Sequence, residues 1–147
     1  MTAPVRLRVY GTPGPQGSKR HVGGGRMVES SKKVGPWREA VVTAAQVAGV
    51  AGLRLDGPLC VAVEFVLRRP KSHYTPKGLL RSTAPCWVTT TPDLDKLLRS
   101  TKDGLVQAGV ICDDKLVAAG RQHKRYAHVG ETPGAIVEIT RLVEGAC

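Results

Sequence analysis

The feature that most constrains the fold is one amphipathic segment that begins at Asp93. Its apolar residues recur at intervals of three and four, which is the spacing of one face of an α-helix. They are Leu94, Leu97, Leu98, Thr101, Leu105 and Ala108, and the opposite face carries Asp95, Arg99, Lys102 and Asp103. A helix with one apolar face has to bury that face against other elements. The chain therefore needs a sheet or further helices beside this segment.

The rest of the sequence supplies such elements. Residues 5–10 alternate apolar and polar like a half-buried strand, and residues 59–67 are rich in β-branched residues. A second helix is expected from Trp37 to a glycine stop at Gly49 or Gly52. Residues 115–129 predict a basic strand, and residues 135–143 predict a final strand that pairs with it as an antiparallel hairpin. The order β-α-β-α-β-β predicts an α+β fold with helices packed on a mixed sheet, in a single domain over residues 1–147.

Two basic connections interrupt this pattern. Residues 11–26 are rich in glycine and proline, so we expect no regular structure there. Residues 68–85 are prolyl and basic and include Tyr74, whose ring can stack on a base. Long connections of this kind are usually functional or disordered. We interpret both as loops that contact DNA phosphates, and solvated or disordered segments remain the alternative.

The overall charge indicates the kind of partner. Lysine and arginine outnumber acidic residues 22 to 12, which gives a formal net charge of +10. Such an excess attracts polyanions, and nucleic acid is the leading candidate. An anionic membrane surface is the alternative partner, but no segment combines a clean apolar face with a basic one. We therefore expect a DNA partner and no membrane.

The sequence also predicts the cellular location and the role of the cysteines. No apolar run approaches the roughly 20 residues that span a bilayer, and the N-terminus lacks the apolar region of a signal peptide. A cytoplasmic protein is the resulting expectation. Cys60, Cys86, Cys112 and Cys147 form no C-x-x-C pair. We interpret them as apolar fillers or surface thiols rather than as a zinc site.

Acidic residues gather at both ends of the amphipathic segment, despite the basic composition. Asp93 and Asp95 lie at its start, and Asp113 and Asp114 follow its end. Carboxylates are the hard oxygen ligands that Mg²⁺ prefers, and such an ion assists phosphodiester hydrolysis. N-capping explains Asp93 equally well, and a turn explains Asp113 and Asp114. The residues alone leave the metal site and these structural roles open.

The segment also resembles a known family. It carries P-D-L-D at 92–95, a cation at 99, D-G-L at 103–105 and D-D at 113–114, after Y-G-T-P-G-P-Q-G-S-K-R at 10–20. This pattern is similar to that of the RusA family of Holliday junction resolvases. The resemblance implies a small homodimeric endonuclease that binds four-way DNA junctions in recombination and repair. It also implies that, with Mg²⁺ or with Mn²⁺ as a possible substitute, the enzyme makes paired symmetric nicks.

The resemblance assigns roles to individual residues. Asp93, Asp95 and Asp114 become the catalytic metal ligands, and Asp113 is their neighbour. Arg99 occupies the position of a family lysine; it keeps the charge but is effectively never deprotonated, so its expected role is electrostatic. The remaining cations are expected on DNA phosphates: Lys19, Arg20, Arg26, Arg68, Arg69, Lys71, Lys102, Arg121, Lys124 and Arg125.

Two other functions compete with a junction-resolving nuclease. One is a catalytically silent module that binds nucleic acid. The other is a metal-dependent hydrolase of nucleotides, or of flap or duplex DNA.

Overall fold

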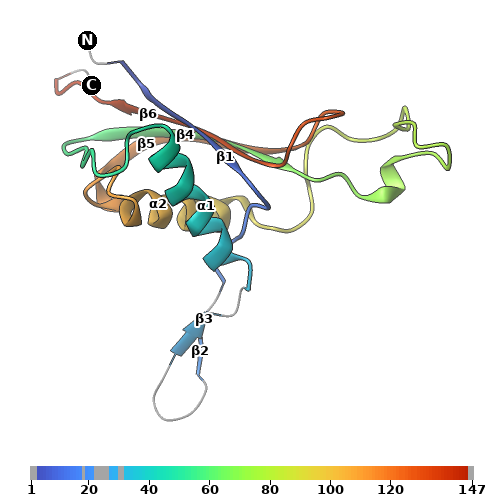
Figure 1. Ribbon diagram of the computed structural model, residues 1–147, viewed down its shortest axis with the longest axis horizontal. Coiled ribbons are helices and arrows are strands. Elements are labelled where there is room, and N and C mark those ends of the chain that lie inside the picture. The colour runs from blue at the N-terminus through green and yellow to red at the C-terminus, as the bar shows by residue number, and fades with distance from the viewer. Residues whose placement is uncertain (1–2, 18, 22–26, 30–31, 146–147) are drawn as a thin grey trace.

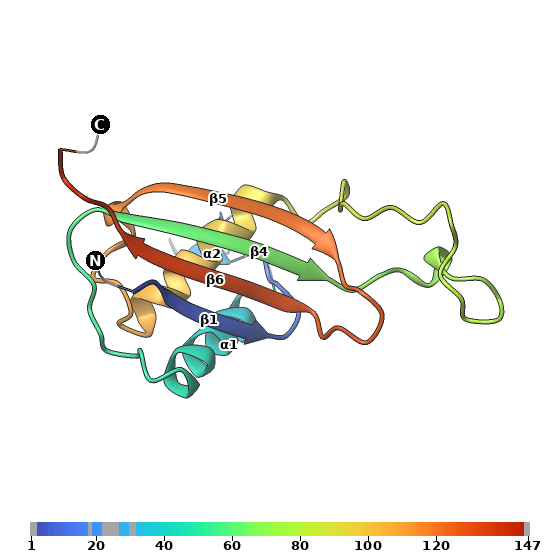
Figure 2. The ribbon, with the colours of Figure 1, turned by 90° about the horizontal axis from the view of Figure 1, so that it is seen from above.

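The computed structural model describes residues 3–17, 19–21, 27–29 and 32–145. Its main sheet has four strands in the order β1-β6-β4-β5. Two helices lie on one face of this sheet and leave the other face open (Figures 1 and 2). The bounds are β1 (Val5–Tyr10), α1 (Val34–Val47), β4 (Leu59–Leu67), α2 (Leu94–Gln107), β5 (Val117–Tyr126) and β6 (Gly134–Arg141). These elements follow the predicted order β-α-β-α-β-β.

The pairing of the last two strands differs from the prediction. β5 and β6 do not form a hairpin, because β4 lies between them (Figure 2). β4 runs antiparallel to β6 and parallel to β5, with Val63 opposite Val137 and Glu64 opposite His123. The apolar β4 takes a central position, whereas the basic β5 takes an edge. Charged side chains are common on edge strands, where they discourage unwanted pairing.

The core lies between the helices and the sheet. The predicted apolar face of α2 is confirmed: Leu97, Thr101 and Leu105 are buried. Glycine lets α2 approach α1 closely, because a Cβ atom on Gly104 would lie 2.9 Å from the Cβ atom of Val41. Among the described residues no helix is long and apolar enough to cross a membrane.

Polar contacts fix the segment that follows β1 against α2. The buried hydroxyl of Ser100 donates to the carbonyl oxygen of Gly14 at 2.6 Å, and the backbone N–H of Gln16 donates to the carbonyl oxygen of Lys96 at 3.0 Å. A side chain at position 14 is excluded, because a Cβ atom there would lie 2.2 Å from the carbonyl oxygen of Lys33. The proline-rich segment therefore borders the N-terminal half of α2.

The first basic connection contains regular structure, contrary to expectation. β2 (Lys19–His21) pairs antiparallel with β3 (Met27–Glu29). Figure 1 shows this pair extending away from the main sheet on the side of the helices. The glycines at 23–25 fall between these two strands in the sequence and lie outside the described residues.

The second basic connection projects from the end of β4 (Figures 1 and 2). It contains a 3-10 turn at Lys71–His73 and an isolated bridge between Tyr74 and Leu80. The backbone N–H of Arg81 donates to the carbonyl oxygen of His73 at 2.9 Å. These contacts give the projection a defined shape.

Candidate functional site

The first pair of acidic residues lies at the N-terminal end of α2. Asp93 occupies the N-cap position, yet its side chain makes no capping hydrogen bond. Its Oδ2 atom lies 3.8 Å from Nζ of Lys96, and 57% of the side chain is exposed. Asp95 is exposed in the first turn. The capping explanation therefore does not account for the carboxylate of Asp93, and both side chains face solvent at one helix end.

β5 holds this end of α2 in place. Nζ of Lys124 donates to the carbonyl oxygens of Thr90 at 2.5 Å and Pro92 at 2.8 Å. The ammonium group thus connects the edge strand to the residues just before Asp93. Lys124 was predicted to bind DNA phosphate, but its visible role is to position the acidic end of the helix.

The second pair lies beyond the opposite end of α2. Asp113 precedes a 3-10 turn at Asp114–Leu116, and its Oδ1 atom accepts from the backbone N–H of Lys115 at 3.0 Å. This bond is the first cause that lowers the pKa of Asp113, and hydrogen bonding with Asp114 is the second. The turn explanation therefore accounts for Asp113, while Asp114 is exposed.

The helix itself separates the two acidic pairs. Fourteen residues of α2 span about 21 Å at about 1.5 Å per residue. The part of the chain that the structure describes contains no group of three or more His, Cys, Asp or Glu residues able to hold a metal ion. The expectation that the sheet brings Asp113 or Asp114 back beside Asp93 is wrong for a single chain. One chain offers two carboxylates at one end and Asp114 at the other.

Two cations accompany the acidic end along the helix. Arg99 follows Asp95 by one turn and is exposed, and Lys102 follows Arg99 by three residues and is half-buried. No hydrogen bond or ion pair to a described residue occupies either side chain. Positive charge is therefore available next to Asp95 on the helix surface.

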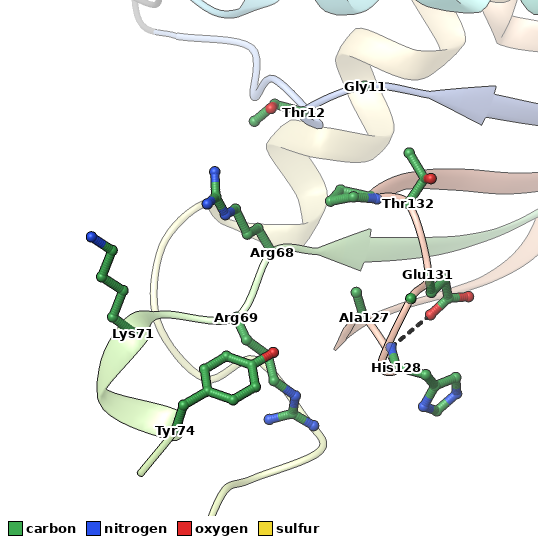
Figure 3. Close-up of a pocket in the computed structure, with 12 residues that line it drawn as sticks. Gly11, Thr12, Arg68, Arg69, Lys71, Tyr74, Ala127, His128, Glu131 and Thr132 are labelled. Carbon is green, nitrogen blue, oxygen red and sulfur yellow. Dashed lines mark hydrogen bonds between the residues drawn. The ribbon is translucent and has the colours of Figure 1, made fainter. Parts of the chain in front are cut away.

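A cavity of about 500 Å³ lies where the projection meets the sheet. Arg68, Arg69 and Lys71 border it together with Tyr74 (Figure 3). Three of the predicted phosphate-binding residues are thus brought together. Of the others, Arg121 is exposed on β5, Lys19 and Arg20 lie in β2, and Arg26 lies outside the described residues.

Arg125 is already paired with two carboxylates. Its guanidinium donates to both oxygens of Glu131, at 2.6 and 2.9 Å, and to Oε1 of Glu64 at 2.9 Å. These contacts raise the pKa of Arg125, and the same guanidinium lowers the pKa of Glu131 to about 2 and that of Glu64. This argues against a phosphate-binding role for Arg125. Neither acid was predicted from the sequence, although a lone glutamate within the apolar β4 was an available signal.

Comparison with protein-family models identifies the relatives of this chain. The model described as "Endodeoxyribonuclease RusA" matches residues 10–140 of the 147-residue chain. A search of curated proteins found no match. The family match spans the proline-rich segment, both helices and three strands of the main sheet, of which only β6 loses its last residue, and it includes only Tyr10 of β1. The chain belongs to the RusA family of endodeoxyribonucleases.

Proposed function

We propose that this protein is a homodimeric, divalent-metal-dependent endonuclease that resolves four-way DNA junctions by paired nicks. Membership of the RusA family supports an endodeoxyribonuclease that acts on Holliday junctions. The observation that carries the metal-dependent part is the pair of solvent-facing carboxylates, Asp93 and Asp95, of which Asp93 makes no capping bond. A net charge of +10 supports a polyanionic substrate.

The donor set fits a hard cation. Asp93 and Asp95 offer carboxylate oxygens, which suit Mg²⁺ and also Mn²⁺. Bound magnesium supplies charge neutralisation at a phosphate and acidifies a coordinated water. Arg99 lies one turn after Asp95 on the exposed side of α2. Its permanent charge stabilises a phosphate rather than transferring a proton.

A second copy of the chain can place its Asp114 beside Asp93 of the first copy. If two α2 helices lie antiparallel about a two-fold axis, the Asp93 end of one copy meets the Asp114 end of the other. Each such meeting point combines three carboxylates. The dimer then has two identical sites, as two matched cuts in a junction require.

The edge strand β5 favours this arrangement. Its outer side, from Val117 to His123, has no neighbouring strand among the described residues. Two such edges can pair antiparallel about a two-fold axis. The start of β5, next to Asp114, then lies beside the far end of the other β5. At that far end, Lys124 contacts Pro92, the residue before Asp93.

Two substitutions test the proposal. We expect Asp93→Asn and Asp114→Asn each to abolish magnesium-dependent cleavage of a labelled four-way junction while junction binding remains. Asp103→Asn is the matched control, because this residue pairs with Arg38 at 3.3 Å in the middle of α2 and should leave cleavage intact. Normal cleavage by both Asp93→Asn and Asp114→Asn would contradict the proposal.

Substrate competition separates the proposal from its rivals. A silent binding module binds the junction and leaves it uncut at every magnesium concentration. A general nuclease cuts linear duplex or flap DNA as fast as the junction. The proposal predicts preferential cutting of the junction, into symmetric nicked products.

A further inference from the structure

The cavity beside the projection is built from three separate parts of the chain. Gly11 and Thr12 follow β1, residues 68–74 follow β4, and residues 127–133 connect β5 to β6 (Figure 3). Its volume of about 500 Å³ falls within the range of small-molecule pockets. The cavity is therefore large enough for one nucleotide.

The border of the cavity carries positively charged side chains, and two of them have no polar partner among the described residues. Arg68 and Lys71 are exposed at its border, and the side chain of neither makes a hydrogen bond or ion pair with another described residue. Arg69, in contrast, is fixed: it donates to the carbonyl oxygen of Pro85 at 2.7 Å and lies 5.2 Å from the ring centre of Tyr126. Two free cations at the border of a fixed cavity suit the phosphates of a nucleotide.

An aromatic ring is placed beside these cations. Tyr74 is half-buried, and its backbone N–H donates to the carbonyl oxygen of Lys71 at 3.0 Å. Figure 3 shows Tyr74 on the same side of the cavity as Arg68 and Lys71, and all three residues line it. The half-buried ring therefore offers an aromatic face at the cavity border on which a base can stack.

The cavity also adjoins the acidic end of α2. Thr12 borders both this cavity and a smaller one that is lined by Leu67, Thr91 and Pro92. Pro92 immediately precedes Asp93. The two cavities therefore form a connected surface between the acidic end of α2 and the cavity that Tyr74 borders.

We propose that this cavity receives one unstacked nucleotide of the DNA strand at the branch point. Arg68 and Lys71 bind its phosphates, and Tyr74 stacks on its base. Taking a base out of the stack costs less where the helical stack is already interrupted, as it is at a branch point, so the cavity favours a branch point over continuous duplex. This inference rests on the proposed function and adds a site for substrate selection.

Binding to an intact junction and to one with abasic residues at the branch point tests this inference. Fluorescence anisotropy gives Kd for both in the uncleaved state, with calcium in place of magnesium. Loss of a stacked base costs between about five-fold and about 150-fold in affinity. We expect Tyr74→Ala to weaken binding of the intact junction by a factor in this range and to leave binding of the abasic junction unchanged.

Three control variants make the result specific. Tyr10→Ala removes an exposed tyrosine that lies outside this cavity, and both affinities should stay at the wild-type value. Tyr74→Phe keeps the ring and should keep the affinity, which also guards against a folding defect in Tyr74→Ala. Lys71→Ala should weaken both junctions equally, because it removes a phosphate contact.

The outcomes distinguish this inference from the proposed function. If wild-type protein binds and cuts the junction but Tyr74→Ala weakens neither DNA, or weakens both equally, the nucleotide site is wrong and the nuclease stands. If wild-type protein neither binds nor cuts the junction, the proposed function fails first.

Discussion

The ion pair between Arg125 and Glu131 allows a quantitative prediction of stability. Glu131 accepts two hydrogen bonds from Arg125 and one from the backbone N–H of His128 at 2.9 Å. Its side chain is 22% exposed. Folding lowers the pKa of Glu131 from 4.5 to about 2. The ionised carboxylate therefore stabilises the folded state.

The magnitude follows from the size of this shift. A change from 4.5 to about 2 corresponds to at most about 3.4 kcal/mol, at about 1.36 kcal/mol per pKa unit. Partial exposure to solvent screens the interaction, and glutamine keeps one acceptor. We expect Glu131→Gln to lower the free energy of unfolding at pH 7 by about 2 kcal/mol.

The direction of the pKa shift determines how this stabilisation changes with pH. Because folding lowers this pKa, the contribution is complete above the unfolded-state pKa of 4.5 and is lost as pH falls through about 2. Urea unfolding at stepped pH should show the gap between wild type and Glu131→Gln closing over this window. Glu138→Gln is the matched control: its pair with Arg6 is exposed, with side chains 41% and 73% accessible. It should cost less than about 1 kcal/mol. A gap that is as large at pH 2.5 as at pH 7, or equal losses in the two variants, would contradict this prediction.

Three further predictions concern packing and DNA binding. Gly104→Leu should destabilise the protein by about 1–3 kcal/mol in urea unfolding, because α1 and α2 lie too close together at Gly104 to admit a larger side chain. Gly35→Ala, with open space around it, should be neutral or stabilising. Thr101→Val should cost about 1–3 kcal/mol, since it removes the acceptor that lies 3.0 Å from the indole nitrogen of buried Trp37; an unchanged unfolding curve would contradict this. Junction affinity should fall log-linearly with salt, with Lys71→Ala reducing the slope by about one; a flat response would exclude phosphate contacts.

Local pattern was enough to predict the elements that build the core. The strand at residues 59–67 followed from its β-branched residues. The buried face of α2 followed from side-chain periodicity, which reports directly on burial. Strand order did not follow, because pairing depends on which strand best tolerates an edge. The basic sequence around Arg121 and Lys124 favours the edge position of β5, and that preference becomes visible only when competing strands are compared.

The candidate site was predictable in its residue types but not in its geometry. Asp93, Asp95 and Asp114 stand out because they are acids in a basic chain. The distance between them depends on the length of α2, and a rigid helix of fourteen residues keeps its two ends apart. Apart from the lone glutamate in β4, nothing in the sequence indicates that Lys124 and Arg125 are engaged in internal contacts, because their partners lie more than thirty residues away or in a loop.

Mixing two inactive variants tests the central claim, that carboxylates from opposite ends of α2 meet across a dimer. A heterodimer of Asp93→Asn and Asp114→Asn chains combines both substitutions in one site and leaves the other site intact. Random mixing should therefore restore single-strand nicking of a four-way junction to about a quarter of the wild-type rate. We expect nicked junction from the refolded mixture and none from either variant alone. A mixture that forms heterodimers and remains inactive would contradict it.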